Sequence, residues 1–166
     1  MDNQDGQYAK SAAKVINKQL YNRMNPTDVR RDWWDPNDKD APYVGRKFAL
    51  SNVASWLGDY IYMRVEEMYF IEAEAKAHEN LGEGIRLLNE FMNNYRIVGG
   101  GYDCTNMSSS VENFTNELML QKRIEFWGEG IVMFDMKRLD MSTRLGYVGT
   151  NSPASYRLNT EGRAPY

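Results

Sequence analysis

The sequence predicts a mainly α-helical protein, built from tetratricopeptide-like helical hairpins joined by long irregular loops. Three observations support this fold class. No proline lies between residues 43 and 152, although prolines occur on both sides of that run. Apolar side chains recur within the run at helical spacing. Glycine-containing segments at residues 81–84, 99–101 and 128–130 then divide it into separate helices.

The first part of the chain predicts one helix followed by irregular structure. An opening helix over residues 8–23 is indicated by apolar residues at helical spacing, namely Ala12, Val15, Ile16 and Leu20. Pro26 follows closely and predicts the end of this helix. Residues 28–58 are rich in Asp, Pro and Trp, and we expect only a short strand there, around residues 47–50.

The centre of the chain predicts a helical hairpin. Helices are expected over residues 62–80 and 85–97, with a tight glycine turn at residues 81–84 between them. The hairpin is about the size of one tetratricopeptide unit. The first helix carries apolar residues on two sides of the helical wheel. We therefore expect it to have neighbours on both faces, or to expose apolar patches.

Two further helices are predicted after residues 99–101. The first covers residues 111–127 and is preceded by a capping-box pattern at residues 109–112. The second covers residues 131–139. Helical periodicity ends after Asp140, so the tail is expected to be loop.

Composition excludes several classes of function. The net charge is −3, which gives no indication of a nucleic-acid-binding surface. The only cysteine is Cys104 and the only histidine is His78, so an internal disulfide, a thiolate metal cluster and a His–His metal pair are excluded. No segment has the 18 or so consecutive apolar residues of a transmembrane helix, and no signal peptide is recognisable at the N-terminus.

Aromatic residues outside the helices are the candidates for sugar binding, because aromatic faces stack on sugar C–H groups while hydroxyls bind polar side chains. Two indoles stand between charged residues in the segment RRDWWD. The same residues would equally suit the edge of a helical layer. The candidate glycan-binding residues are Trp33, Trp34, Tyr43, Tyr95 and Tyr102.

Acidic and basic residues on the helices suggest two alternatives. Two carboxylates on either side of a sugar bond would indicate a glycoside hydrolase, whereas partly buried acids paired with arginines would be structural. We favour a structural ion-pair network and predict no catalytic residue and no metal site. Its expected members are Arg64, Glu67, Glu74, Arg123, Glu125, Glu129, Asp135 and Arg138.

Several motifs resemble those of the SusD/RagB family in their order along the chain. Residues 63–75, MRVEEMYFIEAEA, resemble the family's R-x-A-E-x-Y-L-I-x-A-E-A helix. Residues 121–138, which begin QKRIEFWGEG, resemble its E-R-R-x-E-F-x-x-E-G-x-R-x-x-D-L-K-R block. Residues 28–31 and 47–48 are similar to its D-x-R and K-F marks. Gln121 stands where the family usually has an acid.

The resemblance implies a surface lipoprotein of the bacterial outer membrane that captures oligo- or polysaccharides. Such a protein has a tetratricopeptide-like scaffold, no cofactor and no catalytic residue. It forms a lid over a SusC-type TonB-dependent receptor, and a lipid on an N-terminal cysteine anchors it. Residues 1–166 would correspond to the C-terminal helical region, truncated relative to the family at both ends, with the anchor in the missing N-terminal part.

Two other functions fit the residues. A tetratricopeptide-type protein-interaction scaffold would explain the hairpin over residues 62–97, although the later helices do not repeat it. An all-helical glycosidase would explain the carboxylates. Sugar binding without release of reducing ends would favour capture over both.

Overall fold

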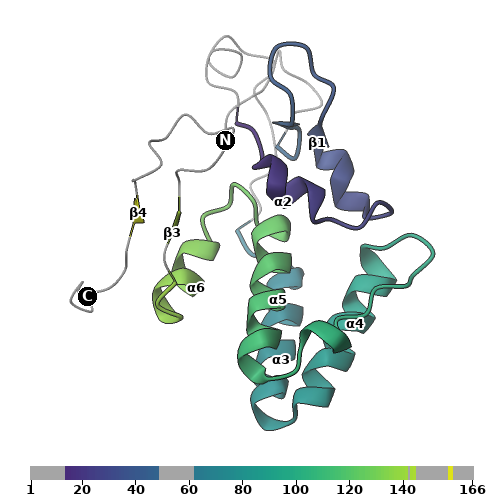
Figure 1. Ribbon diagram of the computed structural model, residues 1–166, viewed down its shortest axis with the longest axis vertical. Helices are drawn as coiled ribbons and strands as arrows, with labels where there is room; N and C mark the ends of the chain where they lie inside the picture. The colour runs from purple at the N-terminus through teal and green to yellow at the C-terminus, as the bar shows by residue number, and fades with distance from the viewer. Residues whose placement is uncertain (1–13, 49–61, 142, 145–156, 159–166) are drawn as a thin grey trace. The chain divides into compact units, whose positions relative to one another are not determined.

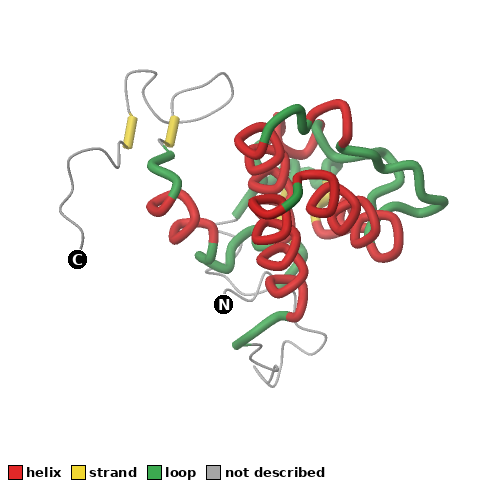
Figure 2. The backbone as a smooth tube through the Cα atoms, turned by 90° about the horizontal axis from the view of Figure 1, so that it is seen from below, coloured by secondary structure: helices red, strands yellow, loops and turns green. Residues whose placement is uncertain are grey.

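The computed structural model describes residues 14–48, 62–141, 143–144 and 157–158. They divide into two compact units, Met1–Ile124 and Glu125–Tyr166. The described helices and strands are α2 (Lys18–Asn22), η1 (Val29–Trp33), β1 (Trp34–Asp35), β2 (Val44–Gly45), α3 (Val65–Glu79), α4 (Leu81–Tyr95), η2 (Thr105–Met107), α5 (Val111–Glu125), α6 (Val132–Arg138), β3 (Thr143–Arg144) and β4 (Arg157–Leu158). Helices dominate the described backbone (Figures 1 and 2), which confirms the predicted mainly α class.

The predicted helical hairpin is formed by α3 and α4 (Figure 1). The prediction of a tight turn at residues 81–84 is wrong, because those residues form the first turn of α4. Asn80 alone separates the two helices. Its extended backbone ends α3, and its side chain accepts hydrogen bonds from the N–H groups of Gly82 (3.0 Å) and Glu83 (3.4 Å). An asparagine N-cap thus replaces the glycine turn.

Gly84 permits close contact between the two helices of the hairpin. A Cβ atom at this position would lie 2.4 Å from Cβ of Ala77 and 2.7 Å from the carbonyl oxygen of Ala73. Both distances are shorter than any normal van der Waals contact. The small residues Ala73 and Ala77 on α3 therefore match the glycine on α4, and the pair of helices packs around this point.

One face of α3 is packed and another is exposed. Phe70, Ala73 and Ala77 are each 1% exposed, and Phe70 packs edge-on against Phe91 of α4 with ring centroids 5.1 Å apart. On the other side, Val65, Met68 and Ile71 are exposed by 65%, 46% and 48%. Exposed apolar side chains on this helix were expected from its two apolar stripes. Self-association through them stays a prediction.

α5 supplies much of the core of the first unit. Phe114 and Leu118 are 0% exposed, and Met119 and Ile124 are each 1% exposed. This helix was predicted over residues 111–127 and is observed over Val111–Glu125. Within the described residues, no helix is long and apolar enough to span a membrane.

The start of the chain differs from the prediction. The expected helix over residues 8–23 is present only as α2 (Lys18–Asn22) among the described residues, and residues 8–13 lie outside them. Val15 instead forms an isolated bridge with Val44. Asn17 starts α2, because its side chain accepts the N–H of Gln19 at 2.7 Å. Ile16 and Leu20 are buried on either side of Asn17, whereas Val15 is 49% exposed, so these apolar residues do not belong to one continuous helix.

The short strand expected at residues 47–50 is also misplaced. Residues 49–50 lie outside the described residues, and Lys47 and Phe48 form a turn. The observed strands are β1 and β2, which pair antiparallel, with Trp34 opposite Gly45. A strand pair this short depends on partners elsewhere in the chain, which local sequence patterns do not reveal.

The second unit contains α6 and a small strand pair. The predicted helix over residues 131–139 is observed as α6, Val132–Arg138. The prediction that the tail is entirely loop is wrong, since β3 pairs antiparallel with β4. The two strands have two residues each, too short for a period-two pattern to be seen in the sequence.

Candidate functional site

The loop after α4 brings Tyr102 back onto that helix. Gly99, Gly100 and Gly101 have φ angles of +79°, +72° and +91°, a backbone conformation that side-chain-bearing residues rarely adopt. This glycine run lets the chain reverse directly after the helix. The glycine segment that separates the helices is therefore a turn of defined geometry.

Two asparagines of α4 hold the returning chain. Asn93 binds the backbone of Tyr102 twice: its Nδ2 donates to the carbonyl oxygen, and its Oδ1 accepts the N–H, both at 2.8 Å. Asn89 accepts the N–H of Cys104 at 2.9 Å and donates to Asp103 at 3.0 Å. The two asparagines are one helical turn apart, so they lie on the same face of α4. Together they fix the position of Tyr102.

Asn93→Ala is expected to release this loop. The substitution removes both hydrogen bonds to Tyr102, and each is worth about 1 kcal/mol net. The amide hydrogen of Tyr102 should therefore exchange with solvent roughly tenfold faster or more, measured by NMR hydrogen exchange. Asn94→Ala, at the neighbouring exposed position, is the control and should leave that exchange rate unchanged. Equal rates in both variants would contradict the proposed role of Asn93.

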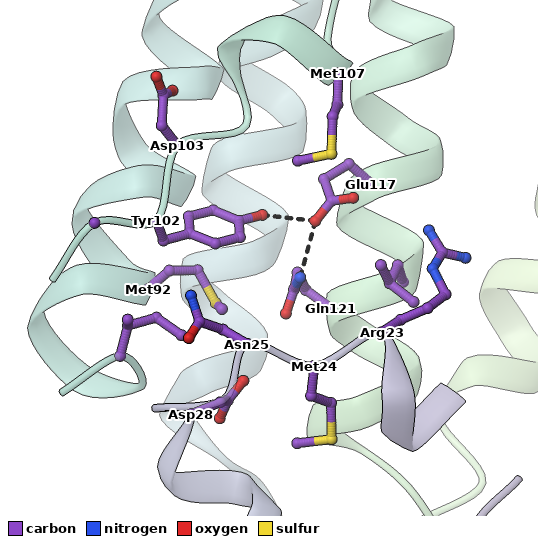
Figure 3. A pocket seen from close by; sticks show the side chains of 13 residues that line it. Arg23, Met24, Asn25, Asp28, Met92, Tyr102, Asp103, Met107, Glu117 and Gln121 are labelled. Carbon is purple, nitrogen blue, oxygen red and sulfur yellow. Dashed lines mark hydrogen bonds between the residues drawn. The ribbon is translucent and has the colours of Figure 1, made fainter. Parts of the chain in front are cut away.

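A pocket of about 350 Å³ opens beside Tyr102 (Figure 3). This volume lies at the lower end of the range for small-molecule sites, roughly 300–1,000 Å³. The apolar part of its wall comes from Met24, Met92, Ile97, Met107 and Leu120. The polar part comes from Arg23, Asn25, Asp28, Tyr102, Asp103, Glu117 and Gln121. The pocket thus combines carbon surface with a few polar groups, as ligand sites do.

A chain of hydrogen bonds crosses the wall of the pocket. The hydroxyl of Tyr102 donates to Oε1 of Glu117 at 2.7 Å, and Nε2 of Gln121 donates to the same oxygen at 2.8 Å (Figure 3). Oε1 of Gln121 in turn accepts from Nη2 of Arg30 at 2.6 Å. Arg30 is 0% exposed and forms an ion pair with Asp28, with 2.7 Å between Nη2 and Oδ2. The network links α5 to η1 and to its N-cap residue, Asp28.

Burial determines the protonation of the two titratable groups on the loop. Burial, together with the neighbouring Glu117 carboxylate, raises the pKa of Tyr102 far above its ordinary value. The hydroxyl therefore stays a neutral hydrogen-bond donor at physiological pH. Burial also raises the pKa of Cys104, which is a free cysteine with 0% exposure. Its thiol is consequently unreactive.

Three of the predicted glycan-binding aromatics belong to one cluster of rings, in which Trp34 and Tyr43 pack against Tyr21 and Trp33 packs against Trp34. Trp34 is 2% exposed and meets Tyr21 edge-on at 6.4 Å between ring centroids. Tyr43 meets it at 5.2 Å. Trp33 is partly exposed, lies 5.8 Å from Trp34 and has Nζ of Lys47 4.8 Å from its ring centroid. Trp33 therefore presents more of its ring to solvent than Trp34, and glycan binding by these three residues stays a prediction.

The other two predicted aromatics lie elsewhere. Tyr102 is at the pocket. Tyr95 of α4 is 51% exposed and packs beside Tyr69 of α3, with ring centroids 5.8 Å apart. Both tyrosines also contact Phe91, at 5.2 Å for Tyr69 and 5.6 Å for Tyr95. The five predicted residues are thus found at three places in the first unit, and only Tyr102 lines the pocket.

Some of the residues predicted to form ion pairs do so, and one of their partners, Glu66, was not among the predicted residues. Glu66 binds Nη2 of Arg64 at 3.2 Å and Nη2 of Arg96 at 2.9 Å. In the second unit, Arg138 binds Asp135 at 2.8 Å. Among the other expected members, Glu74 is 8% and Glu125 0% exposed. Glu67 and Glu129 are partly exposed and Arg123 is exposed. A single network joining all eight stays a prediction.

The polar residues of the pocket, apart from Tyr102, were not singled out from the sequence as site residues. Glu117 and Gln121 are one turn apart on α5, a spacing that also describes an ordinary surface pair. Their burial, 6% and 5% exposed, is visible only in the folded chain. The glycines before Tyr102 were the one available signal, because such a run permits a sharp reversal.

Comparisons of this chain with known proteins indicate one protein family. A model described as the SusD family matches residues 2–163. Among solved structures, the chain is similar to a SusD-like carbohydrate binding protein from Bacteroides vulgatus ATCC 8482, at 29% sequence identity and a TM-score of 0.63. The similarity covers 77% of this chain and 28% of the other, so the chain spans about a quarter of that relative. A comparison with curated protein sequences gave no match.

Proposed function

Because the chain belongs to the SusD family, we propose that it takes part in the capture of glycans without hydrolysing them. The observation that carries this proposal is the family match over residues 2–163. It is supported by the similar structure from Bacteroides vulgatus, which is described as a carbohydrate binding protein. In the described residues, the pocket beside Tyr102 and the partly exposed ring of Trp33 offer surfaces suited to sugars.

The proposal extends to location and partner. A protein of this kind acts at the outer-membrane surface, held by a lipid anchor, and passes its glycan to a SusC-type TonB-dependent receptor. The motifs that resemble the SusD/RagB family support this part of the proposal. A gene for a TonB-dependent receptor next to the gene for this protein would support it, and recovery of that receptor with the tagged protein from solubilised membranes would test it.

The carboxylates of the pocket favour binding over hydrolysis. Glycoside hydrolysis uses two carboxyl groups on either side of a sugar bond. Asp28 is held in an ion pair by Arg30, and Asp103 accepts hydrogen bonds from Thr105 and Asn89. The two carboxylates that share the pocket with Glu117 thus make structural contacts within the chain. We therefore expect titration with oligosaccharides to show binding and no release of reducing sugar.

Trp33→Ala is expected to weaken glycan binding about five- to tenfold, which corresponds to roughly 1–1.4 kcal/mol. The substitution removes a partly exposed ring that offers a stacking surface, and it leaves the buried Trp34 in place. Isothermal titration calorimetry against a panel of oligo- and polysaccharides gives the affinities.

Trp33→Phe is the matched variant, because it keeps an aromatic face and should retain most of the affinity. Circular dichroism should show the same helix content in both variants. Wild-type affinity for Trp33→Ala would place the glycan away from this ring. Release of reducing sugar by the wild-type chain would overturn the non-catalytic proposal.

A further inference from the structure

One carboxylate oxygen in the pocket has no partner within the described part of the chain. Both hydrogen bonds of Glu117 go to Oε1, from Tyr102 and Gln121. The second oxygen, Oε2, accepts no hydrogen bond and joins no ion pair among the described residues, although Glu117 is only 6% exposed. Figure 3 shows this oxygen directed away from the Tyr102 hydroxyl, on the side of the pocket where Arg23 lies. Oε2 is not fully buried, so a hydrogen-bond donor of a ligand in the pocket can reach it.

The donors that Glu117 does have are neutral. Burial keeps Tyr102 protonated, and Gln121 contributes an amide. Arg30, the buried cation that binds Gln121, is already paired with Asp28, so this pair adds little net charge to the pocket. Arg23 also lines the pocket, but it forms no ion pair with Glu117 among the described residues. The negative charge of Glu117 is therefore solvated by hydrogen bonds but not balanced by a cation bonded to it. An added cation would interact strongly there, because the surroundings are poorly solvated.

We infer that the pocket binds the ammonium group of an amino sugar at Oε2 of Glu117. This inference rests on the proposed function, because the geometry indicates the ammonium group and the family indicates the sugar. The sugar ring would lie against the carbon surface of Met92 and Leu120, which line the same pocket. Its hydroxyls would meet the amide of Asn25, another lining residue.

An ammonium group suits this site better than a metal ion. Calcium requires six to eight oxygen ligands, and the described residues contain no group of three or more His, Cys, Asp or Glu side chains able to hold a metal. The available oxygen, Oε2 of Glu117, lies in a pocket whose wall also contains thioether and aliphatic groups. Such a site suits a ligand with one charged hydrogen-bond donor and an apolar carbon surface. An acidic sugar would instead be repelled by Glu117 and by Asp103 at the same pocket.

The test is a titration of the full chain with four probes, followed by NMR chemical shifts and calorimetry. The probes are methyl β-glucosaminide, its N-acetyl derivative, methyl β-glucoside and n-propylammonium. We expect the glucosaminide to bind at least tenfold more tightly than the two neutral sugars. n-Propylammonium should shift the side-chain amide signals of Gln121, which contacts Glu117.

Glu117→Gln should reduce glucosaminide binding at least tenfold, because the amide keeps the shape of the side chain and removes its charge. Glu112→Gln, at an exposed position of the same helix, should bind as wild type does. Arg23→Gln should strengthen glucosaminide binding two- to threefold, since it removes a like charge from the pocket wall. Circular dichroism verifies that each variant is folded.

The outcomes separate this inference from the proposed function. Equal affinity for the three sugars, or wild-type affinity in Glu117→Gln, would overturn it. Binding of n-propylammonium without the glucosaminide would overturn the amino-sugar assignment alone. If neither amine binds while a polysaccharide from the panel does, the pocket inference fails and glycan capture stands. Failure of every glycan combined with binding of n-propylammonium would overturn the proposed function.

Discussion

Asp28→Ala is expected to lower the free energy of unfolding by about 3–5 kcal/mol, as removal of one partner of a buried ion pair does. Asp28 accepts from Nε of Arg30 at 3.0 Å and from Nη2 at 2.7 Å. Arg30 is 0% exposed, so its guanidinium would stay buried without this carboxylate. The Asp28 side chain also accepts the backbone N–H of Arg30 at 2.9 Å and so caps η1. Urea unfolding followed by circular dichroism measures the loss.

A surface pair provides the comparison. Glu79 lies 2.9 Å from Lys76, with exposed fractions of 70% and 46%, and Glu79→Ala should cost less than about 1 kcal/mol. The double variant Asp28→Ala with Arg30→Met should cost less than Asp28→Ala alone, since it removes both buried charges. An Asp28→Ala protein as stable as Glu79→Ala would show that the buried pair is not a structural anchor.

Gly84→Ala is expected to lower the free energy of unfolding by about 1–3 kcal/mol, the usual cost of overpacking. The added methyl group would lie 2.4 Å from Cβ of Ala77 and 2.7 Å from the carbonyl oxygen of Ala73. α3 and α4 would have to move apart, which weakens the contact of Phe70 with Phe91. Thermal and urea unfolding of the two proteins measure the difference.

Gly82→Ala is the matched control on the same helix. A Cβ atom there would lie 3.4 Å from Oδ1 of Asn80, at ordinary contact distance. Alanine is favoured over glycine in a helix by about 1 kcal/mol, so this variant should be as stable as wild type or more stable. Equal stabilities for Gly84→Ala and Gly82→Ala would contradict the close helix contact at Gly84.

α3 and α5 were predictable because their signal is local. Apolar periodicity over residues 62–80 and 111–127 reports which face of a helix is buried, and both were found within three residues of their expected ends. The turn after Asn80 was not predicted, because glycine at residues 82 and 84 suggests a turn as readily as a helix packed against a neighbour. Only the distances to Ala73 and Ala77 decide between them.

The family prediction is confirmed by the match over residues 2–163, whereas the site was predictable only in part. Tyr102 was a candidate because of its ring, but the residue that binds its hydroxyl, Glu117, is 15 positions away in sequence. Gln121 was noted only as a departure from an expected acid. In the folded chain its amide bridges Glu117 and Arg30, a role that requires both a donor and an acceptor. Contacts of this kind depend on tertiary structure.

The two asparagines of α4 have a consequence for the thermodynamics of binding. The side-chain amides of Asn89 and Asn93 form hydrogen bonds with the backbone of Tyr102 and Cys104, and these bonds are present without a ligand. Ordering a free loop upon binding costs conformational entropy, about 1–2 kcal/mol for each residue fixed. Here most of that entropy has already been lost in folding, so this wall of the pocket is preorganised for its ligand.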